Sequence, residues 1–105
     1  MKLLVIESHL GEGIFPCFKE GTIVDNLADC LNTPHWCSGT INGYATYIPE
    51  TYLDNGCLNR DYNPTELVVE EGQTVTLLKV VFEWLYVIDS NNNEGWLPAS
   101  KVVSI

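Results

Sequence analysis

The last forty residues of the chain, 66–105, limit its possible folds more than any other stretch. After an acidic turn, Glu70-Glu71-Gly72, apolar and polar residues alternate, which is the pattern of a half-buried strand. A second apolar run begins at Trp84, and Gly95-Trp96-Leu97-Pro98 leads into a short last strand. No segment of the chain keeps a 3.6-residue apolar period, so we expect a nearly all-β protein.

The first half of the chain shows the same order of residues. The matching segments are 19–21 with 70–72, Trp36 with Trp84, and 47–53 with 96–102. The offsets run from 48 to 51 residues, and they change only inside expected loops, where a difference in length costs little. We interpret this pattern as an internal repeat. The alternative is a chance similarity between two β-rich halves.

The repeat predicts two small domains, residues 1–54 and 55–105, joined by the turn Asp54-Asn55-Gly56. So short a linker leaves little freedom, and domains of about 50–60 residues are marginal alone, so we expect the two to contact each other. Asn42-Gly43 lies between two β-rich runs and predicts a hairpin. The apolar residues Val80-Val81-Phe82 indicate either a covered surface or an extended strand.

This order of parts resembles the Src homology 3 (SH3) domain, a small five-stranded β-barrel that binds peptides. The resemblance implies two tandem SH3-like barrels packed together. In that family, first-strand tyrosines, a Trp that opens the third strand, and a Pro and a Tyr of the last segment form a groove. The groove binds left-handed polyproline segments, and acids beside it pair with an Arg of the ligand.

The second half carries several residues of this groove. The resemblance assigns Asp61-Tyr62 to the first strand, Glu66 and Glu83 to the acidic positions, and Trp84 and Pro98 to the groove wall. An indole face packs against a proline ring, and carboxylates hold a guanidinium. Lys101 stands where the family has a groove Tyr, so it places a cation where a basic ligand would approach.

The first half carries a different part of the same groove. It has Trp36, Pro49 and Tyr52, but its expected first strand, 3–8, contains no Tyr, and His35 takes the place of the acid before the Trp. The residues predicted to bind peptide are Tyr62, Glu66, Glu83, Trp84, Pro98, Trp36, Pro49 and Tyr52. The alternative is that the tryptophans pack at a domain seam, the prolines end strands, and the acids form a solvated rim.

The net charge of −9 limits the choice of partner. Residues 1–54 carry two bases against seven acids, and residues 55–105 carry three against seven. Without a basic patch, nucleic acid is disfavoured and a basic partner is attracted. The apolar run 3–6 is too short for a signal peptide, and nothing approaches the roughly 18 apolar residues of a membrane span. We expect a cytoplasmic protein with no membrane partner.

The chain also contains the residue types of thiol and zinc sites. Its four cysteines are Cys17, Cys30, Cys37 and Cys57. They form no C-x-x-C pair, which favours reduced thiols over disulfides. His35 lies two residues from Cys37, but no acid is placed to orient it and the spacings match no usual zinc pattern. We therefore expect no catalysis, no metal and no cofactor.

These observations together predict a non-catalytic protein-interaction module. It would dock an extended, basic or proline-containing segment on an aromatic groove. One alternative is a structural or assembly pair, with the aromatic residues buried between barrels or between chains. Another is the bacterial SH3 variety that recognises cell-wall peptides, which would require an exported precursor. The solvent exposure of Trp36 and Trp84 distinguishes the peptide groove from the assembly pair. A Trp in a groove is exposed to solvent, whereas a Trp between barrels or chains is buried.

Overall fold

The computed structural model describes residues 1–11, 13–30 and 33–105. The described residues form ten strands and two short 3₁₀ helices, and all pairs of strands are antiparallel. In chain order the elements are β1 (Lys2–Val5), β2 (Asp25–Asp29), β3 (Trp36–Ile41), β4 (Tyr44–Pro49), η1 (Glu50–Tyr52), β5 (Leu53–Asp54), β6 (Cys57–Leu58), β7 (Thr74–Val81), β8 (Trp84–Ile88), β9 (Glu94–Pro98), η2 (Ala99–Lys101) and β10 (Val102–Ser104).

The predicted all-β class is confirmed, although the sheets are open rather than closed barrels. Three antiparallel sheets of five, three and two strands account for the ten strands. Both 3₁₀ helices have three residues. In the part of the chain that the structure describes, no helix has the length and apolar character needed to cross a membrane.

The chain divides into two compact units that do not follow the two halves of the sequence. Unit 1 consists of Met1–Ile14 and Thr65–Ile105, and unit 2 of Phe15–Pro64. This division corrects the predicted boundaries 1–54 and 55–105. The expected linker is the turn of the β5–β6 hairpin, in which Asn55 and Gly56 have φ of 51° and 79°. Positive φ at both residues is what a type I′ two-residue hairpin turn requires.

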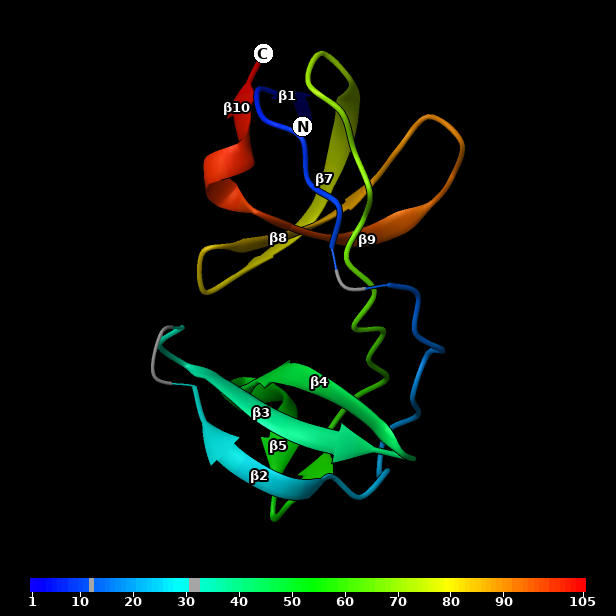
Figure 1. The fold of residues 1–105 in the computed structure, drawn as a ribbon, viewed down its shortest axis with the longest axis vertical. Helices are drawn as coiled ribbons and strands as arrows, with labels where there is room; N and C mark the ends of the chain where they lie inside the picture. The colour runs from blue at the N-terminus through cyan, green and yellow to red at the C-terminus, as the bar shows by residue number, and fades with distance from the viewer. Residues whose placement is uncertain (12, 31–32) are drawn as a thin grey trace. The chain divides into compact units, whose positions relative to one another are not determined.

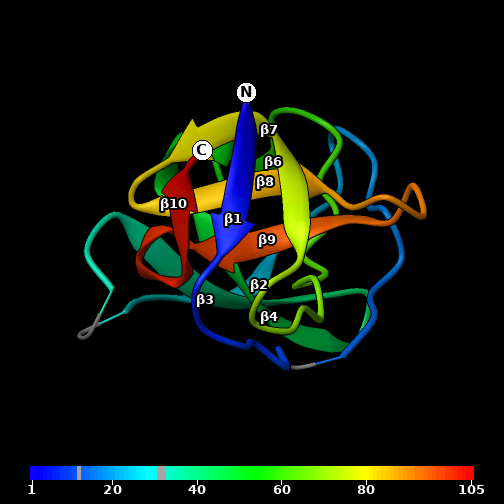
Figure 2. The same ribbon diagram turned by 90° about the horizontal axis from the view of Figure 1, so that it is seen from above.

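Unit 1 contains a five-stranded sheet with the order β10-β1-β7-β8-β9. Figures 1 and 2 show β1, in blue, between β7 and the red C-terminal strand β10. Apolar side chains that alternate along these strands, together with two from the segment before β7, form the core. They are Leu3, Val5, Leu67, Val69, Val75, Leu85, Val87, Leu97 and Val102. The core of unit 1 is thus built from both ends of the chain.

Unit 2 contains the three-stranded sheet β2-β3-β4 and the hairpin β5–β6. Two bridges, Ile23 with Cys57 and Phe18 with Tyr62, place the segment that starts at β6 beside residues 18–23. The predicted hairpin at Asn42-Gly43 is confirmed, since β3 and β4 pair up to Ile41–Tyr44 and the two turn residues have φ of 49° and 87°.

A tight turn joins β7 to β8. Val80 and Val81 belong to β7, so they extend the strand, but not into the core, because Val80 is 59% exposed. Phe82 and Glu83 form the turn before Trp84, with φ of 46° and 70°. The left-handed region costs a residue with a side chain roughly 1–2 kcal/mol, and neither residue is Gly or Asn. The backbone is therefore strained directly before Trp84.

Four backbone contacts occur in the same form in both units. The strand pair Trp36–Pro49 of unit 2 matches Trp84–Pro98 of unit 1. Three hydrogen bonds of unit 2 are Glu50 N–H to the His35 carbonyl (2.9 Å), Asn59 N–H to the Tyr52 carbonyl (2.8 Å) and Gly21 N–H to the Leu58 carbonyl (2.7 Å). Their counterparts in unit 1, in the same order, are Ala99 N–H to the Glu83 carbonyl (2.9 Å), Ile6 N–H to the Lys101 carbonyl (2.8 Å) and Gly72 N–H to the Val5 carbonyl (2.8 Å). Val5 and Leu58 thus occupy matching positions, and β1 does in unit 1 what the segment from β6 does in unit 2.

Candidate functional site

Trp84 and Pro98 form the centre of the candidate site in unit 1. Trp84 opens β8 and is the strand partner of Pro98, the last residue of β9. Pro98 has φ of −62° and ψ of 138°, so its backbone is still extended, and η2 begins at the next residue. Side chains of directly paired residues lie on one face of a sheet. Both residues are half-buried, so the structure brings two predicted groove residues together within partial reach of solvent.

His9 contacts Trp84 and pairs with Glu66. Nε2 of His9 lies 2.8 Å from Oε1 of Glu66, and the imidazole meets the Trp84 ring edge-on with 6.1 Å between centroids. The two paired side chains are only 15% and 17% exposed. Gly11 permits this approach, because a Cβ there would lie 2.7 Å from Cβ of Glu66. We call Trp84, Pro98, His9 and Glu66 the Trp84 site.

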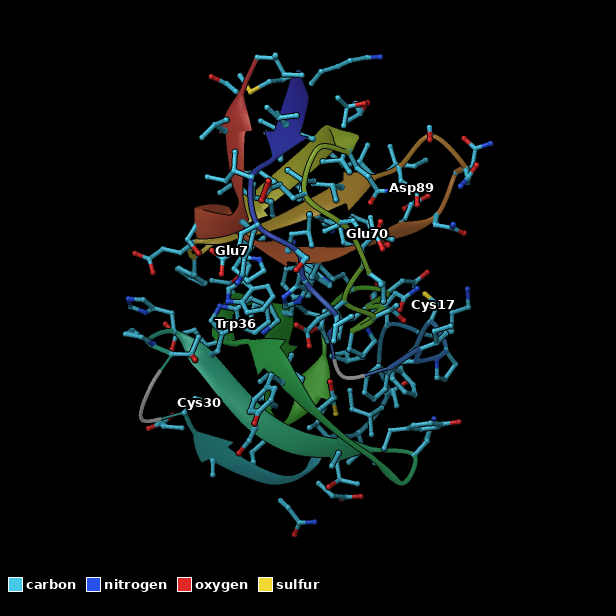
Figure 3. All side chains as sticks on the ribbon, turned by 45° about the horizontal axis from the view of Figure 1, so that its top comes forward. Glu7, Cys17, Cys30, Trp36, Glu70 and Asp89 are labelled. Atoms are coloured by element: carbon cyan, nitrogen blue, oxygen red, sulfur yellow. The ribbon has the colours of Figure 1, made fainter. Side chains whose placement is uncertain are left out.

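A second pair of charged residues borders the Trp84 site along the chain. Nζ of Lys101, the last residue of η2, donates to Oε1 of Glu7 at 2.8 Å. Figure 3 shows Glu7 on the segment that follows β1. Exposed pairs of this kind contribute up to about 1 kcal/mol. The cation at Lys101, which the sequence placed against a basic ligand, is therefore partly offset by Glu7.

Glu83 contributes to the site mainly through its backbone. Its side chain is exposed and adjacent to Trp84 in the chain, as the sequence predicted for an acid of the groove. Its carbonyl accepts the N–H of Ala99 at 2.9 Å, which fixes the start of η2. Glu83 therefore couples the strained turn to the helix that follows Pro98.

Sequence reasoning missed Glu7 and His9, because it assigned residues 1–54 to the other domain. The signal that identifies His9 is its bridge to Val69, which matches the bridge between Tyr62 and Phe18 in unit 2. His9 thus stands in unit 1 where Tyr62 stands in unit 2. The assignment of Tyr62 to the Trp84 groove is corrected, because Tyr62 belongs to unit 2.

Unit 2 brings Tyr62 together with the predicted groove residues of the first half. Trp36 is 6% exposed, Tyr62 3% and Tyr52 2%, and Pro49 is among the fully buried side chains. Figure 3 shows Trp36 at the start of β3. The aromatic set that neither half of the sequence held alone is complete in unit 2, but it is buried.

Contacts within unit 2 fix two of these rings. Tyr52 and Tyr62 meet edge to face with 5.4 Å between centroids, and the hydroxyl of Tyr62 donates to the Tyr47 carbonyl at 2.6 Å. The guanidinium of Arg60 lies 4.4 Å from the centre of the Tyr52 ring, which is the geometry of a cation–π contact. A side chain of the same chain therefore covers one face of Tyr52.

His35 does have an acid beside it, contrary to the sequence analysis. Nδ1 of His35 lies 2.8 Å from Oε1 of Glu50, and both side chains are about half exposed. Burial raises the pKa of the Cys37 thiol, and the neighbouring carboxylates of Asp29 and Glu50 and the thiol of Cys30 raise it further. A raised pKa keeps the thiol protonated at neutral pH, whereas a nucleophile needs the thiolate.

The remaining cysteines and acids were compared with thiol and metal sites over residues 1–11, 13–30 and 33–105. All four cysteines are free thiols. Burial, and next the charge of Asp29, raises the pKa of Cys30 as well. Over the ranges that the structure describes, no group of three or more His, Cys, Asp or Glu residues is arranged to hold a metal ion.

Comparison of the chain with protein-family models, with curated proteins and with solved structures found no match.

Proposed function

We propose that both units are SH3-like and related by an internal repeat, and that unit 1 docks an extended, basic or proline-containing protein segment at the Trp84 site. Unit 1 has five strands in one sheet. Trp84 opens the third of these strands in chain order, where the resemblance places the groove Trp. The matching backbone contacts of the two units support the repeat.

The observation that carries the proposal is the half-buried pair Trp84 and Pro98, with His9 against the indole and the carboxylate of Glu66 paired to His9. The indole face offers a surface for a proline ring, and a segment that is already extended loses little entropy on binding. The segments of unit 1 carry three bases against eight acids, a net charge of −5 that attracts a basic partner.

The ligand's cation has to compete with the hydrogen-bond partners that the acids of the site already have. Glu66 already faces His9, and Glu7 faces Lys101. A guanidinium forms two parallel hydrogen bonds with a carboxylate, which neither an ammonium nor an imidazole does. We therefore expect the Trp84 site to prefer Arg over Lys in its ligand.

The burial of the matching residues in unit 2 favours a second function there. Trp36, Pro49, Tyr52 and Tyr62 have little surface left to offer a ligand. We propose that this set is structural and that unit 2 has a structural or assembly role. The same groove residues would then bind in one unit and pack in the other.

The experiment that tests the proposal is an NMR titration of the full chain with Arg-flanked P-x-x-P peptides, following the three tryptophan indole signals. We expect a saturable shift of the Trp84 indole, while Trp36 and Trp96 respond little because they are 6% and 2% exposed. Peptides with Lys in place of Arg should bind more weakly. A Trp84 indole that stays silent across the peptide set would contradict docking at this site.

Two variants with the same change of charge distinguish binding at the Trp84 site from attraction by the net charge of the chain. Glu66→Gln removes the acid of the Trp84 site and should weaken binding severalfold. Glu94→Gln is the matched control, since Glu94 pairs with Ile88 at the other end of the β8–β9 ladder, four register steps from Trp84. Equal weakening by both variants would show that net charge, rather than the Trp84 site, attracts the peptide.

A further inference from the structure

We propose that β1 is a transferable strand, and that two copies of this chain form a dimer in which residues 1–14 of each copy complete unit 1 of the other. The inference does not depend on peptide binding. It follows from the way in which the two ends of the chain share one sheet.

The first strands of the two units form matching backbone hydrogen bonds. Leu4 of β1 lies opposite Thr74 in unit 1, and Cys57 of β6 lies opposite Ile23 in unit 2. The hydrogen bonds around Val5 match those around Leu58, as described above. In the chain, β1 comes directly before unit 2, yet it belongs to unit 1. The segment from β6 comes directly before the second part of unit 1, yet it belongs to unit 2. The first strands have therefore changed places relative to the order of the repeat.

β1 is joined to the rest of unit 1 only through the whole of unit 2. Residues 15–64 separate the two parts of unit 1. The strand partners of β1 lie in β7 and β10, so β1 fills the position between these two strands in the sheet. The main-chain bonds include Val5 N–H to the Gln73 carbonyl and Leu77 N–H to the Met1 carbonyl, both 2.8 Å.

A second copy offers the same position with the same partners. Since every contact of β1 with β7 and β10 is retained, monomer and dimer differ chiefly in the connection between units. The effective concentration of the tethered strand then sets the balance, and exchange of an identical element is a low-cost route to a dimer. Leaving the sheet requires β1 to lose both neighbours, so the form reached during folding should persist.

Exchange also changes which chain builds the Trp84 site. Glu7 and His9 lie on residues 1–14, whereas Glu66, Trp84 and Lys101 lie on residues 65–105. In the dimer, both the pair at Glu66 and the pair at Lys101 would therefore join two copies. Each Trp84 site would be incomplete without a second chain.

The test uses the full chain with its four cysteines replaced by Ser. One copy carries Leu4→Cys and the other Thr74→Cys, because these residues are direct partners in the β1–β7 ladder. Directly opposed residues without mutual hydrogen bonds lie about 4.5 Å apart at Cα, which suits a disulfide. The two variants are unfolded in urea, mixed, refolded over a range of concentrations, oxidised and separated on a non-reducing gel.

We expect a mixed disulfide dimer that exceeds the background of either variant refolded alone. While monomer predominates, a tenfold higher refolding concentration should raise the ratio of dimer to monomer about tenfold by mass action. The double variant Leu4→Cys/Thr74→Cys should close within one chain at low concentration. The proposal is overturned if the double variant closes but the mixture gives no excess dimer, or if the double variant fails to close.

A second measurement covers the case in which the Ser background does not fold. The unaltered chain, kept reduced, is refolded at high and at low concentration, and its mass is then measured by light scattering at one common dilution. A dimer fraction that reflects the refolding concentration supports strand transfer. A monomer under both conditions contradicts it.

Discussion

Glu83 lies in the left-handed region, with φ of 70°, in the turn that leads into Trp84. That region costs a residue with a Cβ about 1–2 kcal/mol, which a glycine avoids. Glycine also has greater freedom in the unfolded chain, and this lowers the stability gained by roughly 0.5–1 kcal/mol. We therefore expect Glu83→Gly to raise the free energy of unfolding by about 1 kcal/mol. Urea unfolding followed by tryptophan fluorescence measures it.

Glu83→Ala is the matched control, because it removes the same carboxylate but keeps the Cβ. It should show no comparable gain. If the Gly and Ala variants unfold alike, the charge of Glu83 and not the strain of the turn sets its effect on stability.

The carboxyl group of Asp61 makes the free energy of unfolding depend on pH in the acid range. The N–H of Glu20 donates to Oδ1 of Asp61 at 2.9 Å and lowers the pKa of that carboxyl, and Lys19 lowers it further from 3.6 Å. A lowered pKa stabilises the fold fully above the ordinary value of about 3.9, and the contribution is lost as the pH falls through the folded-state pKa.

Asp61→Asn should therefore destabilise the chain at pH 7 and lose less stability than the wild type on acidification below about pH 4. Urea midpoints at neutral and acid pH give both values. Parallel pH profiles for the two proteins would show that the carboxylate of Asp61 plays no part in the acid limb.

At the scale of the elements, Gly95 holds β9 against the segment before β7. A Cβ at Gly95 would lie 2.7 Å from the backbone nitrogen and 2.9 Å from Cα of Leu67. That segment is bonded to β9, since Leu67 N–H donates to the Trp96 carbonyl at 3.1 Å and Trp96 N–H to the Thr65 carbonyl at 2.9 Å. The backbone cannot yield without breaking these bonds, and overpacking costs about 1–3 kcal/mol or more.

Gly95→Ala should therefore destabilise the chain more than Gly39→Ala. At Gly39 the nearest atom to a new Cβ, at 2.6 Å, is Cγ1 of Val24, which belongs to a side chain that can rotate. Because Glu66 precedes Leu67, Gly95→Ala should also shift the Trp84 indole signal, whereas Gly39→Ala leaves it in place. Comparable losses of stability with an unchanged indole would contradict a role for Gly95 in positioning Glu66.

The elements that the sequence could predict are those whose information is local. Asn42-Gly43 identifies its hairpin because both residues tolerate positive φ. The Trp84–Pro98 pair could also be predicted from the sequence. A Trp that opens one strand and a Pro that ends the following strand mark the same end of a hairpin ladder. Residue pattern and turn chemistry within some 15 positions were sufficient.

The partner of β1 could not be predicted in this way. The alternation at Leu3 and Val5 indicates a strand with one buried face, but it does not say which sheet buries that face. Unit 2 and unit 1 present matching positions to it, so sequence order suggested the wrong one. Glu7 and His9 were missed for the same reason, since their role depends on the unit that β1 joins.

At the scale of the whole molecule, the native Cys57 reports which first strand belongs to which unit. Cys57 faces Ile23 in unit 2, and its matching residue Leu4 faces Thr74 in unit 1. With the other three cysteines replaced by Ser, Ile23→Cys should form a disulfide with Cys57, and Thr74→Cys should not. Mass spectrometry of oxidised protein at low concentration distinguishes the two. Closure of the Thr74 variant within one chain would restore the predicted boundaries 1–54 and 55–105.

The division of unit 1 into Met1–Ile14 and Thr65–Ile105 has a consequence during synthesis on the ribosome. Unit 2 has all its strands once Pro64 has been added, but β1 must wait for β7 and β10, which follow in the last 41 residues. At about 5–20 residues per second, that wait lasts roughly 2–8 s. For this interval Leu3 and Val5 lack the strands that bury them. Nascent copies on one messenger would meet during that interval, when β1 is open to chaperones and to its neighbours.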